Sequence, residues 1–507
     1  MKKNAIPFRV PHLSLLALAV AALSLSGCAI KPTPFTDAEL MQKAQTDRTT
    51  MFAHQEALAG PITLDEAMAR AIRYNLDHRL KMMEEALGQK QLDLSNFDLL
   101  PKLTAQAGYT GRDRELASSS VSLYNPNDTT VPPSYSSNRN DRTADLGFSW
   151  NLLDFGVSYY EAKEQADHVL VLEQRRRKVV QLMMQQVREA YWQAAGSQRL
   201  HDRIGPLLDQ ARVALNDSRQ AQQEQLRAPL ETLNYQHELL DIMRQLEVIR
   251  DQLDEAKPRL ASLMNLEPGK DFTLAPPKGF EIQTFDMPIT TMEETALKSR
   301  PELVEADYNE RISINETHKA LAKLLPGIEL DIGAHYDNNS FLSYSAWRAA
   351  GISVSWNLLN LLNAKNIKGT ANAQLEVAKT QRLALSMAVL TQVYVARSDL
   401  EAKHRQFDLL KQLNDVDQQI LEHTHNATQA NAQGKLEEIR AATSAMMSEL
   451  RLYQSYGEFE GAYGQLLSSL GLDPVPDAVQ SYDLATLEQA IDREQLHWAE
   501  LGHGAKQ

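Results

Sequence analysis

The pentapeptide Ser149-Trp150-Asn151-Leu152-Leu153 recurs farther along this chain as Ser355-Trp356-Asn357-Leu358-Leu359. An identity of this length that includes Trp and Asn is rare by chance. Upstream, Leu99-Leu100-Pro101 recurs as Leu324-Leu325-Pro326, at a longer spacing than that of the pentapeptide. These two recurrences predict two copies of one structural unit. The difference between the two spacings places one insertion in the first copy, between its proline and its tryptophan.

The duplication determines the domain organisation that we expect. Length alone would suggest roughly three domains, and the repeat replaces that number with two copies of one unit. The expected parts, in chain order, are a signal peptide at 1–27, an N-terminal segment at 28–61, the first copy at 62–268, a linker at 269–286, the second copy at 287–474 and a tail at 475–507.

Apolar and polar residues alternate in four segments, two in each copy. Such alternation predicts strands with one apolar and one polar face. The predicted strands lie at about 102–112, 143–152, 327–337 and 348–358. Their length fits tilted transmembrane strands, although a soluble sandwich has the same local pattern. Because four strands cannot close a barrel and lipid does not tolerate open sheet edges, membrane strands would require several chains to share one barrel.

The remainder of each copy predicts a long helical hairpin, at about 157–265 and about 363–470. Apolar residues recur every three or four positions, in the same register in both copies, which is typical of coiled coils. A helix of about 60 residues would be about 90 Å long, enough to cross much of a periplasm. The expected hairpin tips are at Ala228 and Pro229 in the first copy and at Gly434 in the second.

The N-terminus has the features of a secretory signal peptide. Basic residues precede an apolar stretch at 13–25, which is too short to span a membrane as a helix. Leu25-Ser26-Gly27-Cys28 resembles the bacterial lipobox, and Cys28 is the only cysteine in the chain. The resemblance implies cleavage before Cys28 and attachment of lipid to it. Because Ala29 follows, and not the Asp of an inner-membrane retention signal, we expect delivery to the outer membrane.

Composition argues against several other classes of protein. A single cysteine excludes a disulfide framework and a cysteine-based zinc site. Removal of residues 1–27, which carry three positive charges, changes the net charge from −14 to −17. Such an acidic chain lacks the overall basic character of a general nucleic-acid binder. A mean hydropathy of −0.40 argues against a membrane protein with many spanning helices.

The order of these features resembles the TolC family of outer-membrane efflux proteins. The resemblance is carried by Leu64-Asp65-Glu66-Ala67, Leu100-Pro101-Lys102-Leu103, residues 148–156, Leu325-Pro326-Gly327-Ile328, residues 354–359, and Gly434 with residues 436–439. It implies a mostly α fold with a transmembrane β-barrel part, made of two tandem β-β-long α-hairpin repeats. It implies a homotrimer with a 12-stranded barrel that continues as a periplasmic α-barrel. A periplasmic adaptor protein and an inner-membrane pump are the implied partners.

A duct needs a polar lumen and a gate, and we therefore expect no catalytic residue, cofactor or metal. The candidate lumen residues are Asp145, Ser149, Glu329, Asp331, Ser353 and Ser355. The resemblance places gate residues at Glu437 and Arg440, and Glu231 is the counterpart of Glu437 in the first copy. In a trimer, a ring of carboxylates could bind cations and an arginine could tie neighbouring helices together. The alternative is that these are solvated helix-surface charges, worth at most about 0.5 kcal/mol each.

The run Arg175-Arg176-Arg177-Lys178 is open to two interpretations. It could form a patch for phosphate or lipid headgroups, or it could be a solvated face. Arg176 has a counterpart in the second copy, Arg382, which favours a structural role.

The function that we expect is a passive outer-membrane duct of a tripartite efflux system, which carries small molecules and is driven by an inner-membrane pump. We expect no enzymatic activity. A duct for type I secretion or polymer export is the alternative within the same class. A different class is a lipid-anchored coiled-coil protein with a structural or adhesive role. The sequence does not identify the transported substrate, because in this family the pump selects it.

Overall fold

The computed structural model describes residues 32–118, 124, 134–224, 228–275, 279–282, 285–430, 434–475 and 481–502. The predicted signal peptide and Cys28 lie outside these residues. The chain forms two compact units, Met1–Gln55 and Glu56–Gln507. In the first unit, helix α2 (Asp37–Met51) begins with a capping box, in which Thr36 and Glu39 satisfy each other's backbone N–H groups.

The second unit contains both copies, and its helices repeat at the two spacings found in the sequence. Before the strands, α3 (Leu64–Tyr74) and α4 (Leu76–Phe97) return as α7 (Ile289–Ser299) and α8 (Pro301–Ala322), at the spacing that separates Pro101 from Pro326. After the strands, α5 (Leu152–Gln223) and α6 (Pro229–Leu263) return as α9 (Leu358–Gln429) and α10 (Lys435–Leu470). The starts of these later helices keep the shorter spacing of the pentapeptide. The predicted duplication is therefore confirmed.

The repeated pentapeptide is the junction between a strand and a long helix. Asn151 is the N-cap of α5, and its side-chain oxygen accepts hydrogen bonds from the backbone N–H groups of Leu153 and Asp154 at 2.9 and 3.3 Å. Asn357 caps α9 in the same way through the N–H of Leu359, at 3.2 Å. Asparagine is a favoured N-cap because it satisfies N–H groups that the first helical turn leaves unpaired.

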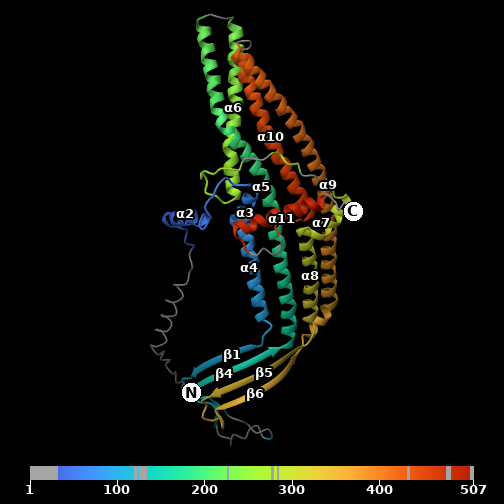
Figure 1. Cartoon of the computed structure of the whole chain (residues 1–507). Coiled ribbons are helices and arrows are strands. Elements are labelled where there is room, and N and C mark those ends of the chain that lie inside the picture. The colour runs from blue at the N-terminus through green and yellow to red at the C-terminus, as the bar shows by residue number, and fades with distance from the viewer. Residues whose placement is uncertain are drawn as a thin grey trace, which may run out of the picture. The chain divides into compact units, whose positions relative to one another are not determined.

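The two long helices, α5 and α9, have 72 residues each, which corresponds to about 108 Å. Each pairs with a shorter antiparallel helix, α5 with α6 and α9 with α10, to form a hairpin. Figure 1 shows both hairpins extending away from the sheet, with α4 and α8 alongside the segments near the sheet. Pro206 lies inside α5 and Pro258 inside α6, so neither proline ends its helix.

Four antiparallel strands form one sheet in the order β1-β4-β5-β6. The strands are β1 (Lys102–Gly111), β4 (Asn140–Asn151), β5 (Gly327–Asp337) and β6 (Ala346–Ser355). Strands β4 and β5 come from different copies, so their pairing joins the two repeats. Strands β1 and β6 lie at the two edges of the sheet.

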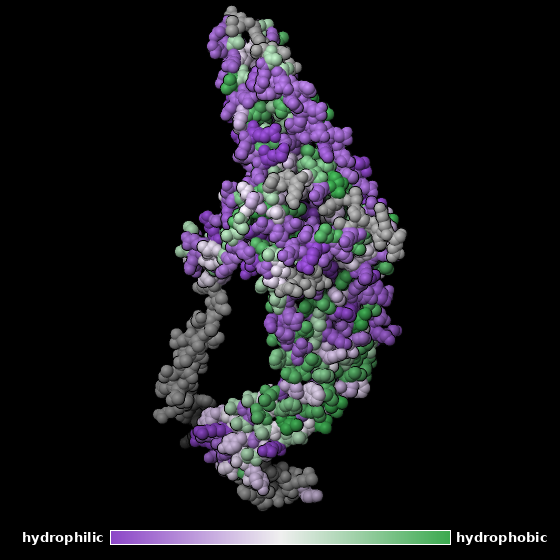
Figure 2. All heavy atoms as spheres, in the orientation of Figure 1, coloured by the Kyte–Doolittle hydropathy of each residue, from purple (hydrophilic) through white to green (hydrophobic). Residues whose placement is uncertain are grey.

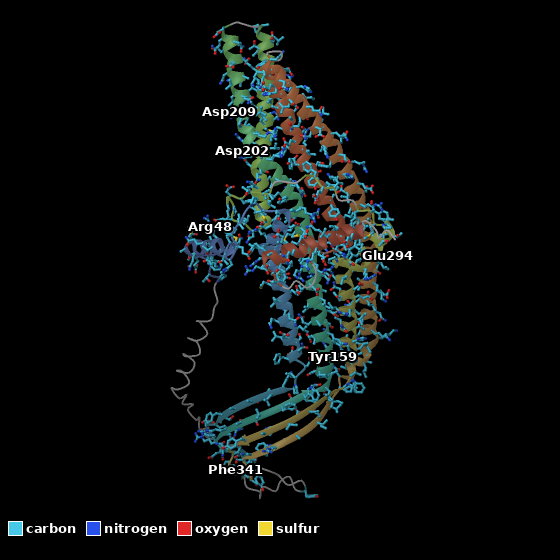
Figure 3. The ribbon with its side chains drawn as sticks, in the orientation of Figure 1. Arg48, Tyr159, Asp202, Asp209, Glu294 and Phe341 are labelled. Atoms are coloured by element: carbon cyan, nitrogen blue, oxygen red, sulfur yellow. The ribbon has the colours of Figure 1, made fainter. Side chains whose placement is uncertain are left out.

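The predicted insertion of the first copy lies between β1 and β4. Residues 112–139 connect these strands, whereas only residues 338–345 connect β5 to β6. The longer connection contains a second pair of strands, β2 (Ala117–Ser118) and β3 (Ser134–Tyr135). Figure 3 shows Phe341 of the shorter connection at the end of the sheet away from the helices, whereas Tyr159 of α5 lies close to the sheet.

Helices α6 and α10 end with the same backbone geometry in both copies. Asn265 follows α6 with a φ of 55°, and its counterpart Gly471 follows α10 with a φ of 75°. The next N–H in each copy, from Leu266 and Leu472, donates to the carbonyl of Ala261 and Leu467. This is the Schellman pattern, in which a left-handed residue lets the chain satisfy the last carbonyls of a helix.

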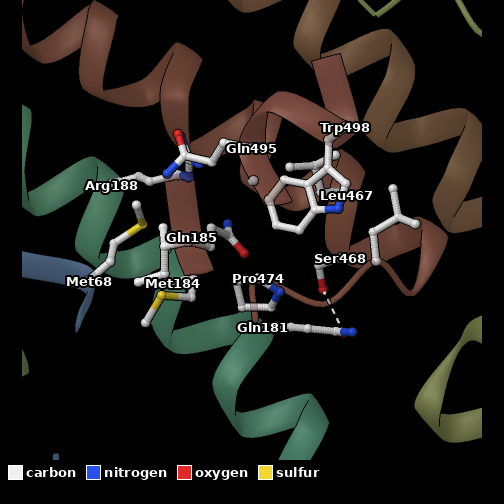
Figure 4. Close-up of a pocket in the computed structure, with 13 residues that line it drawn as sticks. Met68, Gln181, Met184, Gln185, Arg188, Leu467, Ser468, Pro474, Gln495 and Trp498 are labelled. Carbon is white, nitrogen blue, oxygen red and sulfur yellow. Dashed lines mark hydrogen bonds between the residues drawn. The ribbon is translucent and has the colours of Figure 1, made fainter. Parts of the chain in front are cut away.

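The segment predicted as a C-terminal tail contains a helix that belongs to the core. Helix α11 (Leu484–Gly502) buries Leu487 and Ile491 in the same apolar cluster as α3. Its Trp498 is buried in the cluster of the second copy, formed by α7, α9 and α10. Figure 4 shows Trp498 at a small pocket whose walls include Leu467 of α10 and Arg188 of α5. Helix α11 therefore connects the cores of the two repeats.

Apolar side chains are concentrated on the part of the second unit that contains the sheet. Figure 2 shows them over the strands and the adjoining helix ends, whereas the helices farther from the sheet are mostly hydrophilic. The exposed apolar residues at the starts of α5 and α9 include Leu152, Phe155, Leu358, Leu359, Leu361 and Leu362. Within the described part of the chain, no helix combines the length and the apolar character that a membrane span requires.

Candidate functional site

The six candidate lumen residues lie on one face of the sheet. Strand pairing aligns Ser149 with Asp331 and Glu329 with Ser353. Alternation along β4 and β6 then places Asp145 and Ser355 on this same face. We call it the polar face. The opposite face carries Leu103, Leu146, Phe148, Trp150, Leu330, Ile332, Ile352 and Val354.

A row of three paired residues crosses the polar face, and its histidine was not among the residues that the sequence suggested. Asp145 of β4 is paired with His335 of β5, which is paired with Trp347 of β6. The Nδ1 atom of His335 lies 2.6 Å from a carboxylate oxygen of Asp145. The imidazole and the indole are stacked, with ring centroids 5.3 Å apart and an angle of 22° between their planes. The alternation of β5 contained His335, but its partners became visible only once the strand register was known.

The other candidate residues lie near the ends of the hairpins. Ala228 is the N-cap of α6, Pro229 is its first residue, and Gly434 is the N-cap of α10. Residues 225–227 and 431–433, between the paired helices, lie outside the described residues. Glu231 lies in the first turn of α6 and Glu437 in the first turn of α10, where carboxylates interact favourably with the helix dipole.

A groove near these helix ends brings the three candidate gate residues together. Its walls come from α5, α6 and the start of α10, and they include Glu231, Glu437 and Arg440. Arg440 donates to both carboxylate oxygens of Glu437, at 2.8 and 2.7 Å. It also bonds Glu238 of α6, a contact that joins the first copy to the second. The hydrogen bond with Glu238 is the main reason that the pKa of Arg440 is raised.

Glu238 is the gate-region residue that the sequence analysis missed. It lies seven positions after Glu231 on α6, which places both on one side of the helix, two turns apart. That spacing was a signal that could have been used. Its partner on α10 could not be predicted, because the sequence does not determine how the two hairpins are aligned.

A second polar cluster joins α9 to the start of α10. The carboxylate of Glu438 accepts hydrogen bonds from His425 and Lys435, each at 2.7 Å. Gln429 contacts the other ring nitrogen of His425 at 2.8 Å. Burial opposes ionisation of Glu438, but the hydrogen bonds from Lys435 and His425 outweigh it and lower the pKa of this carboxyl.

The basic run in α5 has a structural role, since all four cations form ion pairs. The pairs are Arg175 with Glu305 of α8, Arg176 with Glu85 of α4, Arg177 with Asp473 after α10, and Lys178 with Glu302 of α8. In the second copy, Arg382 of α9 pairs with Asp307 of α8. The repeated arginine therefore joins each long helix to a helix that precedes a strand. Arg176 and Arg177 are the more buried members of the run, whereas Arg175 and Lys178 are paired but also more than half exposed.

One ion pair is buried between the two repeats. Arg188 of α5 donates to Glu460 of α10 at 2.9 Å, and both side chains are only 4% exposed. The guanidinium also lies 5.8 Å from the ring of Tyr463. Because an isolated buried charge is costly, each member of this pair depends on the other. Across the described ranges, no group of three or more His, Cys, Asp or Glu residues is arranged to hold a metal ion.

Residues 78–266 match the family model described as outer membrane efflux protein. A comparison with curated protein sequences finds no significant match. Among solved structures, the chain is similar to the CmeC outer membrane channel of Campylobacter jejuni, with a TM-score of 0.62 and 12% identity. That match covers 92% of this chain and 96% of CmeC.

Two further structures have the same fold. The MtrE outer membrane channel of Neisseria gonorrhoeae, solved in its open state, has a TM-score of 0.58 and 16% identity. The match covers 81% of this chain and 89% of MtrE. CusC, studied for its transmembrane channel formation, has a TM-score of 0.62 and 15% identity, and the match covers 83% of this chain and 96% of CusC. The likeness therefore extends over both copies, beyond the segment that matches the family model.

Proposed function

We propose that this chain, which belongs to the outer membrane efflux protein family, forms the outer-membrane exit duct of a tripartite efflux system. In this proposal the polar face lines the lumen, and the hairpins continue the duct into the periplasm. The chain supplies a passive path with a gate, and an inner-membrane pump supplies the energy through a periplasmic adaptor protein.

The sheet is the observation that carries the proposal. Strands β1 and β6 leave two unpaired edges, and every residue in both strands is exposed. Unpaired backbone groups are costly in lipid. Pairing of β1 in one copy with β6 in the next removes these edges, and three copies of a four-stranded sheet provide twelve strands, more than the roughly eight that a barrel needs. This geometry, together with the family, supports a homotrimer.

Helix α9 supports the same assembly. Its exposed apolar residues Leu409, Leu413, Val416 and Ile420 are spaced by four, three and four positions, which is the spacing of a coiled-coil contact. We call these four residues the α9 stripe. Its side chains are between 41% and 66% exposed in the single chain. A neighbouring copy of the chain is the partner that a trimer would place against it.

The two faces of the sheet support a membrane location with a wet interior. The face opposite the polar face provides the side chains that contact lipid. On the polar face, Asp145, Glu329 and Asp331 provide charge to the lumen. Carboxylates in a pore favour cations over anions. We propose that Cys28, acylated after removal of residues 1–27, anchors the chain to the same membrane.

We propose Arg440 as the central residue of the periplasmic gate. Its ion pair with Glu238 connects the start of α10 to α6, so it holds the hairpins of the two copies together near their ends, and the pair with Glu437 lies within α10. Separation of the hairpins requires the α6 contact to break. Glu231, in the same groove, adds a further carboxylate to the gate.

Native mass spectrometry of the detergent-purified protein tests the assembly on which the duct depends. We expect a trimer of a chain whose N-terminal residue is an acylated Cys28. A protein that remains monomeric at micromolar concentration would refute the shared barrel, and an unmodified N-terminus would refute only the anchor. Variants of the α9 stripe, described in the Discussion, distinguish a specific trimer from non-specific detergent aggregates.

A further inference from the structure

In the row formed by Asp145, His335 and Trp347, contacts with its neighbours fix the position of the histidine ring. The 2.6 Å contact between the imidazole and the carboxylate fixes one edge of the histidine ring, and the stacked indole of Trp347 covers one of its faces. A Cβ atom at Gly333 would lie 2.5 Å from Nε2 of His335. The ring therefore occupies the space that a Cβ atom at residue 333 would need, so a side chain at that residue would displace the ring.

The row is open to its surroundings. The side chain of His335 is 30% exposed and that of Asp145 is 38% exposed. In the trimer described above, both side chains lie on the lumen wall, where passing ions interact with them. Each trimer would contain three such rows.

The other charged groups on the polar face are mostly carboxylates. Strand β1 contributes Lys102, β4 contributes Asp141 and Asp145, β5 contributes Glu329, Asp331, His335 and Asp337, and β6 contributes none. Arg112, just beyond β1, lies 3.9 Å from Asp141. Within the strands, the polar face has a net charge of −4 when His335 is neutral and −3 when it is protonated.

We propose that Asp145 and His335 determine the charge selectivity of the lumen and make it depend on pH. Histidine is the side chain whose charge normally changes between pH 5 and 8. When His335 is neutral, Asp145 presents a full negative charge to passing ions. When His335 is protonated, its charge cancels that of Asp145 across the 2.6 Å contact, and the lumen favours cations less. This inference rests on the proposed function, because it requires the polar face to line a conducting lumen.

Reversal potentials across a planar lipid bilayer with a KCl gradient test this inference. For the unmodified protein, we expect the K⁺/Cl⁻ permeability ratio to be lower at pH 5 than at pH 8, with its logarithm reduced by about a quarter, the fraction of the face's charge that protonation removes. His335→Gln should give the same ratio at both pH values. Asp145→Asn should lower the ratio at pH 8 and keep the decrease at pH 5. Because two variants are tested, the inference can still be judged if one of them fails to assemble.

His168→Gln is the matched control, because His168 lies on α5 away from the strands and is exposed. It should behave as the unmodified protein does. A ratio that is equal at pH 8 and pH 5 in the unmodified protein would overturn the inference. An undiminished decrease in His335→Gln would overturn it as well, because other carboxyl groups would then be responsible. In both cases the duct still conducts, whereas an absence of all current would overturn the proposed function itself.

Discussion

Gly471 is the residue at which a single methyl group should be most damaging. It ends α10 with a φ of 75°, in the left-handed region that L-residues with a side chain rarely adopt. A Cβ atom there would lie 2.5 Å from both the carbonyl carbon and the oxygen of Ser299, and 2.6 Å from the nitrogen of Arg300. All three are backbone atoms at the boundary between α7 and α8, so a side-chain rotation cannot relieve the contact.

The cost of Gly471→Ala has two parts. Left-handed backbone costs alanine about 1–2 kcal/mol, and forcing extra volume into a packed site costs about 1–3 kcal/mol. The expected loss of unfolding free energy is therefore about 2–5 kcal/mol. Asn265→Ala, at the same position of the first copy, provides the matched control, because Asn265 already carries a Cβ atom with a φ of 55°. It should cost only about 1 kcal/mol.

Urea unfolding followed by circular dichroism at the helix band measures both variants. Gly471→Asn separates the two contributions, because asparagine tolerates left-handed backbone but still introduces the Cβ atom. We expect Gly471→Asn to lie between Gly471→Ala and the unmodified protein. The steric argument is wrong if Gly471→Ala and Asn265→Ala destabilise the protein equally.

Three further predictions follow from other contacts. Arg188→Met or Glu460→Gln should each cost about 3–5 kcal/mol, because each leaves a buried group unpaired, whereas the double variant Arg188→Met/Glu460→Met should be close to neutral; a double variant as unstable as the singles in urea unfolding contradicts this. Leu413→Asp in the α9 stripe should convert trimers to monomers in native mass spectrometry, and the exposed Gln419→Asp should not; equal effects would reject the stripe as a contact. Hydrogen bonds from Ser481 and Thr486 lower the pKa of Asp483 to about 2, so this N-terminal cap stabilises α11 fully above the ordinary Asp pKa of about 3.9 and loses its effect as pH falls toward 2. Asp483→Ala should therefore increase hydrogen exchange in α11 at pH 7 but not at pH 2, and an increase of equal size at both pH values would disprove the cap.

The duplication made much of the fold predictable from the sequence. The two spacings found in short motifs recur in the helix starts before and after the strands. The alternation of polar and apolar residues along each strand placed the candidate lumen residues on one face. This prediction was possible because the periodicity of a strand depends only on local sequence. The junction between β4 and the long helix α5 was predicted only approximately: the expected strand ended at 152 and the expected helix began at about 157, whereas Asn151 caps a helix that begins at Leu152.

The contacts between distant segments were not predictable in this way. Helix α11 lay within a segment assigned as a tail, because the sequence does not show that Leu487 and Trp498 enter the cores of different copies. The partners of the basic run lie on three other segments, so their charges alone could not distinguish a ligand site from a structural one. Glu238 and His335 were missed because their partners depend on hairpin alignment and strand register.

Single-channel current in a planar lipid bilayer tests the central claim, that this chain is a gated duct, most directly. We expect the purified protein to insert and give discrete current steps with a low open probability. Arg440→Ala removes the ion pair with Glu238 that joins α10 to α6, together with the pair with Glu437 within α10. Because these side chains are between 40% and 49% exposed, we expect the pairs to stabilise the closed state by about 0.5–1 kcal/mol, so the open probability should rise about 2–5-fold. An unchanged open probability in Arg440→Ala would reject this residue as the gate. If neither the unmodified protein nor Arg440→Ala inserts into the bilayer and gives current steps, the duct itself is contradicted.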